Sequence, residues 1–128
     1  MVDALYQAHR AVRPGGAIID LRPDSTHQPR IVQRRVLRGG LAETALAEGD
    51  SAASDRAVAT LVRRGQLRPL RVGRFWYSLR FADRTALDDW LETSRRLRGY
   101  ARGTRSRIEP QIPLVVRRAI AYGIYERL

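Results

Sequence analysis

The segment 2–21 constrains the fold most, because it encodes a helix, a sharp turn and a strand in direct succession. Apolar side chains recur at the spacing of one helical face as far as Val12. Pro14 disfavours helical backbone in the residue before it, and the two glycines that follow can turn the chain. A short, nearly continuous apolar run at 17–21 comes next. It predicts a strand covered on both faces, as in a parallel α/β sheet.

Further elements follow along the chain. A helix is expected at 51–65, and alternating aromatic residues predict a strand at 74–81. Thr85 and Asp88 resemble a capping box, which predicts a helix that closes at Gly99. The last apolar segment, 114–128, predicts a final strand, whereas residues 30–49 fit either a strand or a helical turn. The expected fold class is therefore α/β.

Length and composition narrow the class of protein. The 128 residues suit a single domain that spans 1–128, and 44% hydrophobic with 29% charged residues is typical of a soluble globular chain. No apolar run is long enough for a membrane span, and the first residues lack the features of an export signal, so a cytoplasmic location is expected. The absence of cysteine excludes disulfides, thiolate metal sites and a cysteine nucleophile.

The net charge of +11 suggests a polyanionic partner such as nucleic acid. All 24 basic residues are arginine, a composition that GC-rich coding DNA also produces. The densest basic stretch surrounds Tyr100, and arginine interleaved with an aromatic ring suits a surface that follows phosphates and stacks on bases. Its arginines are Arg95, Arg96, Arg98, Arg102, Arg105 and Arg107. The first three are also expected at the C-terminal end of the helix that closes at Gly99, where they complement its dipole.

No catalytic set and no metal site emerge from the residues. His9 lies on the apolar face of the first predicted helix, and His27 lies in a loop without a neighbouring cluster of ligands. Asp88, Asp89 and Glu92 are interpreted as charges near the start of a helix.

Residues 4–20 also resemble a known family. The run Ala-Leu-Tyr-Gln-Ala-His-Arg-Ala-Val-Arg-Pro-Gly-Gly, followed by Ala-Ile-Ile-Asp, is similar to the helix, Pro-Gly-Gly turn and fifth strand of class I S-adenosylmethionine-dependent methyltransferases. Val12 stands where that family usually has leucine. The later order of helix and strands is similar to that of the rest of the C-terminal half of the family's fold. The resemblance implies a partial Rossmann-like methyltransferase sheet, its fifth to seventh strands, with flanking helices.

The same resemblance implies that the cofactor-binding half of the fold is missing, because the family's glycine-rich turn and acidic strand end lie earlier than this segment. S-adenosylmethionine is then expected only if a missing N-terminal half is supplied, by a separately encoded chain or within a homo-oligomer. Residues just after the fifth strand face the substrate in such folds, which makes Arg22, Asp24 and His27 candidates on the substrate side. The alternatives are a noncatalytic nucleic-acid-binding module and a dimerisation module.

Overall fold

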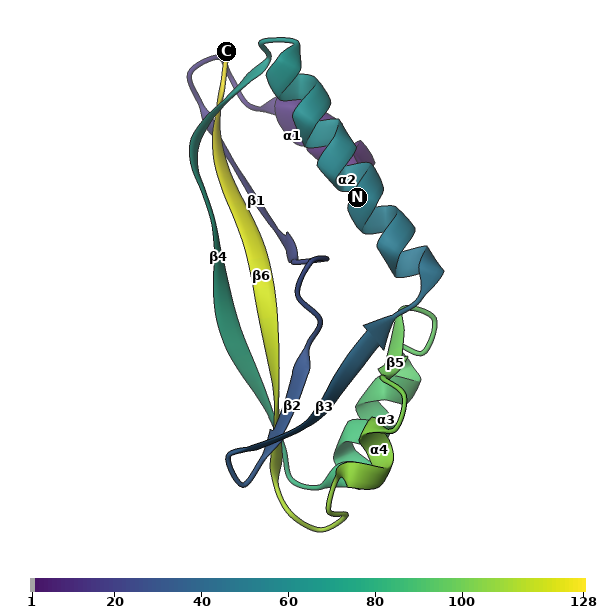
Figure 1. Cartoon of the computed structure of the whole chain (residues 1–128). Helices are drawn as coiled ribbons and strands as arrows, with labels where there is room; N and C mark the ends of the chain where they lie inside the picture. Colours follow the sequence, from purple (N-terminus) through teal and green to yellow (C-terminus); the bar gives the residue numbers. More distant parts are fainter. Residues whose placement is uncertain (1) are drawn as a thin grey trace. The chain divides into compact units, whose positions relative to one another are not determined.

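A computed structural model describes residues 2–128 (Figure 1). Its elements are α1 (Val2–Ala11), β1 (Ala17–Pro23), β2 (Arg30–Gln33), β3 (Val36–Glu43), α2 (Ala45–Arg63), β4 (Leu67–Phe81), α3 (Arg84–Thr93), β5 (Arg98–Tyr100), α4 (Thr104–Arg107) and β6 (Leu114–Arg127). The fold is α/β, as expected, with a six-stranded antiparallel sheet and flanking helices. In residues 2–128, no helix is both long and apolar enough to cross a membrane.

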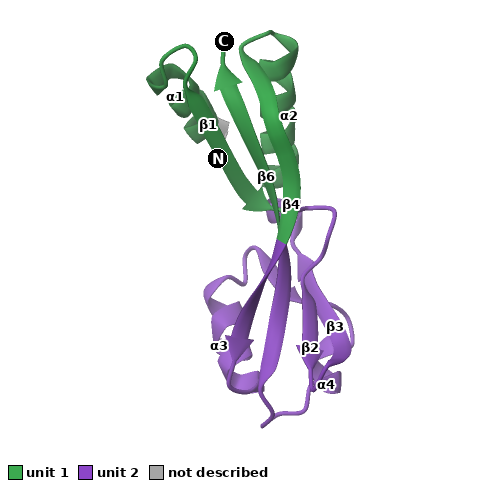
Figure 2. Cartoon of the chain, turned by 90° about the vertical axis from the view of Figure 1, so that its left-hand side faces the viewer, with its two compact units in different colours: residues 1–23, 49–75, 120–128 green, residues 24–48, 76–119 purple. Residues whose placement is uncertain are grey.

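The chain divides into two compact units, each built from separate stretches of sequence (Figure 2). Unit 1 contains residues 1–23, 49–75 and 120–128, and unit 2 contains residues 24–48 and 76–119. Strands β4 and β6 contribute residues to both units.

In unit 1, strand β6 lies between β1 and β4 (Figure 2). Strand β1 pairs antiparallel with β6, and Ile18 of β1 lies opposite Tyr125 of β6. These two side chains form the core with Val58, Leu61 and Leu67, and apolar residues of α1 pack against it. The helical periodicity places Leu5 and Ala8 on one face of α1, which is partly buried against this core, as in an amphipathic surface helix. Val12, just after the helix, packs on the same core.

The turn after α1 confirms the sequence prediction. Gly15 has a φ of 82° and donates its backbone N–H to the carbonyl of Arg127 at 2.7 Å. A Cβ on Gly16 would collide with the side chain of Val12. Both glycines are thus needed to bring the chain from the helix directly into the sheet.

The environment expected for β1 is wrong. The apolar run at 17–21 predicted a strand of a parallel sheet, covered on both faces, whereas β1 is antiparallel to β6. Ile19 is 65% exposed and Leu21 is 58% exposed, because alternate side chains of β1 point away from the core that contains Ile18. An apolar run sets the strand conformation but leaves the direction of its partner open.

In unit 2, β2 pairs with both β6 and β3, and β3 also pairs with β5. The core contains Ile31, Leu41, Leu87, Leu91, Ile108, Leu114 and Val116. Helix α3 contributes Leu87 and Leu91, and the chain around α4 contributes Ile108, so both helices lie on the core side of these strands (Figure 1).

Several predicted boundaries differ from the structure. The ambiguous stretch 30–49 forms the β2–β3 hairpin and then the start of α2, which extends to Arg63. Ser51, the first residue of the helix expected at 51–65, consequently lies inside α2. The sequence does not indicate this tight hairpin turn, because the turn contains neither glycine nor asparagine, the residues that usually mark one.

The arginines near residue 95 are also placed differently. Helix α3 is capped by Asp83, whose side chain accepts the N–H of Ala86 at 2.8 Å, and it ends at Thr93. Arg95 therefore follows the helix, and Arg98 belongs to β5. The prediction that these arginines lie in the last turn of the helix and complement its dipole is wrong, because the helix already ends at Thr93.

Candidate nucleic-acid interface

Unit 2 has a sheet face that lies opposite α3 and α4. Strands β2 and β6 place Ile31 opposite Val116 and Arg30 opposite Arg117. Ile31 and Val116 are fully buried against the two helices. Because successive side chains of a strand point to opposite faces, Arg30 and Arg117 lie on the other face.

Strand β4 adds an aromatic ring to this face. Leu79 and Phe81 pack on the core, so the alternation of β4 places Trp76, Ser78 and Arg80 on the opposite side. Trp76 is half-buried, whereas Ser78 and Arg80 are exposed. The sheet therefore presents an indole ring among basic and small polar side chains.

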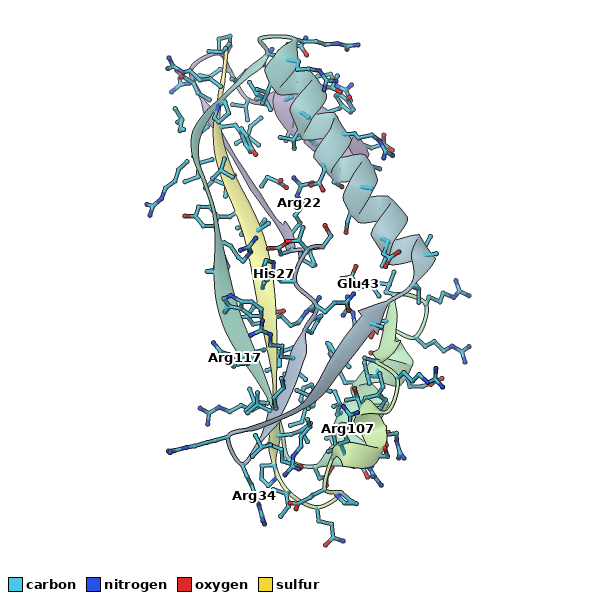
Figure 3. The ribbon with its side chains drawn as sticks, viewed as in Figure 1. Arg22, His27, Arg34, Glu43, Arg107 and Arg117 are labelled. Carbon is cyan, nitrogen blue, oxygen red and sulfur yellow. The ribbon has the colours of Figure 1, made fainter. Side chains whose placement is uncertain are left out.

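Trp76 is the centre of a compact cluster. The guanidinium carbon of Arg30 lies 5.1 Å from the centroid of its ring, and that of Arg117 lies 5.9 Å from it. The imidazole of His27 meets the indole edge-on, with 5.8 Å between the ring centroids and 89° between the ring planes. These four side chains line a cavity of about 260 Å³. We call them the Trp76 cluster, and Figure 3 labels His27 and Arg117.

The Trp76 cluster carries two guanidinium charges. Within residues 2–128, neither Arg30 nor Arg117 forms an ion pair with a carboxylate. The two guanidiniums are carried by directly opposed residues of neighbouring strands, where like charges destabilise the sheet. The negative face of the indole compensates part of this repulsion. A bound anion would compensate the rest.

The loop that carries His27 is held by its own hydrogen bonds. Asp24 is 8% exposed, and its Oδ1 accepts the backbone N–H of Thr26 at 2.9 Å and the hydroxyl of Thr26 at 2.7 Å. The Nδ1 atom of His27 lies 2.8 Å from the Thr26 hydroxyl and 3.3 Å from Asp24 Oδ2. These contacts orient the imidazole against Trp76 and leave its Nε2 atom out of the loop's hydrogen bonds.

The substrate-side candidates from the sequence belong to two different units. Asp24 and His27 lie in unit 2, where His27 joins the Trp76 cluster and Asp24 positions it. Arg22 lies in unit 1, where its guanidinium pairs with Asp20 at 3.2 Å and with Asp55 at 2.9 Å. The charge of Arg22 is therefore neutralised by two carboxylates of unit 1.

The basic stretch at 95–107 contains fewer free charges than its sequence indicates. Arg95 pairs with Glu92 at 3.2 Å, and Arg105 pairs with Asp88 at 2.8 Å. Its remaining exposed arginines are Arg96, Arg102 and Arg107.

Arg98 and Tyr100 are engaged within unit 2. The guanidinium of Arg98 lies 5.5 Å from the ring centroid of Trp90, and its pKa is lowered by burial and by the charge of Arg118. The hydroxyl of Tyr100 donates to Asp88 at 2.6 Å. Burial and this hydrogen bond to a carboxylate both raise the pKa of Tyr100.

Sequence reasoning did not select Arg30, Trp76 or Arg117. Arg30 and Arg117 are far apart in the chain and meet only through strand pairing. One local signal was present: Trp76 occupies the face of the aromatic strand that otherwise carries Ser78 and Arg80. A large aromatic residue on the polar side of an alternating strand is a candidate for a binding surface.

No family model matches the chain, and no curated protein or solved structure is significantly similar to it. Across residues 2–128, the histidine and carboxylate side chains form no cluster that could hold a metal ion.

Proposed function

We propose that this chain is a noncatalytic module that binds nucleic acid through the Trp76 cluster. The observation that carries the proposal is the pair of unneutralised guanidiniums, Arg30 and Arg117, on either side of a half-buried indole on the open sheet face of unit 2. Guanidiniums bind phosphate oxygens with bidentate geometry, and an indole offers a stacking surface to a base. The net charge of +11 adds long-range attraction to the polyanion.

Single-stranded nucleic acid suits this surface best. The bases of a duplex are stacked on one another, whereas an unpaired base can lie on an aromatic side chain. The cavity of about 260 Å³ is lined by four side chains from a loop and three strands. A flexible strand can place a base at the indole and its flanking phosphates at the two arginines.

The test is the salt dependence of oligonucleotide binding. Binding of a labelled oligouridylate, followed by fluorescence anisotropy over a range of salt concentrations, is expected to weaken with a logarithmic slope of ~0.7 per phosphate contacted. The double variant Arg30→Gln, Arg117→Gln should lower that slope by about 1.4, since it removes two contacts. Arg63→Gln with Arg64→Gln is the matched control, because it removes the same charge from exposed positions of unit 1. Equal slopes for the two double variants would show that only net charge matters and would overturn the proposal.

Unit 1 supports a second proposal, that the chain is the C-terminal half of a methyltransferase-type domain. Its helix α1, its Pro-Gly-Gly turn and β1 are followed by α2, β4 and β6 in the order that the resemblance implies. The fifth to seventh strands of the family would then correspond to β1, β4 and β6. Among the described strands, β1 lies at the end of the strand order and pairs with β6, which leaves its other edge for another chain to pair with. Ile19 and Leu21 are exposed on one face of this strand.

Under this second proposal, methyl transfer requires the cofactor-binding half of the fold in addition to residues 1–128. The protein's contribution would be to position the methyl acceptor in line with the sulfonium. Calorimetric titration of the chain alone with S-adenosylmethionine should release no heat up to millimolar ligand. Saturable micromolar binding would contradict the half-fold. Sedimentation tests the homo-oligomer separately, and a clean monomer at micromolar concentration argues against it.

A further inference from the structure

The turn between β2 and β3 has an unusual composition for its backbone. Gln33 pairs with Val36, so the loop contains only Arg34 and Arg35. Both arginines have positive φ, 51° for Arg34 and 63° for Arg35. This is the left-handed conformation at both central positions that defines a tight hairpin turn of the primed type.

Arginine is a poor residue for this backbone. In the left-handed region the Cβ atom crowds the backbone, and for this reason Asn-Gly and Asp-Gly dominate such turns. Residues held in this region concentrate at ligand clamps and binding sites, where the side chain has a use that offsets the strain. Two consecutive strained arginines therefore require an explanation.

Contacts within unit 2 do not supply that explanation. The Arg34 side chain is 61% exposed, and the ion pair that it forms with the half-exposed Glu109 has a separation of 3.5 Å. Arg35 is exposed and, among the residues described, pairs with no carboxylate. Figure 3 shows Arg34 at the tip of the hairpin. Solvent-exposed ion pairs of this kind stabilise a fold very little.

We infer that Arg34 and Arg35 form a second phosphate-binding point for the nucleic acid held at the Trp76 cluster. The inference rests on the proposed nucleic-acid binding. Strand β2 connects the two points directly, since Arg30 begins the strand and Arg34 follows its last residue. At ~3.3 Å per residue the separation along the strand is roughly 13 Å, a distance that a few nucleotides of a bound strand can cover.

The test exploits the strain of the turn. The variant Arg34→Asn, Arg35→Gly installs the residues that this backbone prefers and removes two charges. It should raise the melting temperature and weaken oligouridylate binding, with the salt slope lowered by about 1.4. Arg34→Gln with Arg35→Gln separates charge from strain, and it should lower the slope equally without the gain in melting temperature.

The outcomes distinguish this inference from the proposal on which it depends. If the wild-type chain binds no oligouridylate, nucleic-acid binding fails and the hairpin contact fails with it. If the wild-type chain binds and either hairpin variant keeps the wild-type slope, only the hairpin contact is refuted. A hairpin effect no larger than that of the control Arg63→Gln, Arg64→Gln would likewise refute it, because both double variants lower the net charge by two.

Discussion

Trp76 allows the most direct measurement of base stacking, because the chain contains only two tryptophans. Trp90 packs against Phe81, with 5.6 Å between the ring centroids, beside the core of unit 2. The variant Trp90→Phe therefore leaves Trp76 as the single indole emitter. Titration with oligouridylate should quench its emission as a base covers the ring.

The size of the effect follows from the contacts of the ring. Alanine substitution of a stacking residue costs ~1–3 kcal/mol per base, which weakens binding about 5- to 150-fold. Trp76→Ala should produce a loss in this range. Trp76 is only half-buried and lies opposite the core, so its removal should lower the melting temperature modestly, through the loss of its contacts with the two guanidiniums. Trp76→Phe keeps an aromatic surface and should bind more tightly than Trp76→Ala.

Two results would refute this reasoning. One is an affinity of Trp76→Ala within about twofold of the wild-type value, since stacking of even one base predicts a loss of about fivefold. The other is emission from the Trp90→Phe variant that stays constant while anisotropy reports binding. The converse variant, Trp76→Phe with Trp90 retained, is the control, and its emission should not respond.

Three further predictions concern stability. Gln33→Leu removes the buried amide that bonds the backbone of residues 109 and 112 at 2.9 Å, and urea denaturation should show a loss of about 2–3 kcal/mol. Gly39→Ala places a methyl group against the buried Thr104 at a φ of 147°, so the melting temperature should fall, whereas alanine at the uncrowded Gly49 provides the control. The hydrogen bond from Arg105 lowers the pKa of Asp88 below its ordinary value of 3.8, against the opposing effect of burial. The ionised carboxylate therefore stabilises the fold above that value, and the contribution should be lost as the pH falls through the lowered pKa. Asp88→Asn should remove this part of the pH dependence of unfolding, and an unchanged acid limb would contradict it.

The parts of the fold that sequence predicted well are those with a local cause. Pro14 ends the helical region and Gly15 takes the positive φ of the turn, and both effects arise from one residue and its neighbours. The alternation at 74–81 correctly indicates a strand, although β4 begins earlier, at Leu67. Periodicity misses its first half, where Pro69 and a series of arginines replace the alternating pattern.

The candidate site was predicted only in part. His27 was selected from its position after β1, and it joins the Trp76 cluster, but Arg30 and Arg117 carry no local mark that separates them from the other arginines. Arg95 and Arg105 were selected because they belong to the densest basic stretch of the sequence, yet the structure pairs each of them with a carboxylate. A guanidinium is free or neutralised according to its neighbours in space, which a run of basic residues does not reveal.

By itself, the sequence determined the class of the chain and its local conformations. The absence of cysteine excludes thiolate chemistry, arginine alone supplies the positive charge, and the Pro14–Gly16 turn directs a helix into a strand. Only the tertiary structure decided the direction of β1, the face on which Trp76 lies and the pairing of Arg30 with Arg117. The physical reason is the range of the interactions. Backbone preferences act within a few residues, whereas strand partners, burial and charge neutralisation depend on residues brought together from opposite ends of the chain.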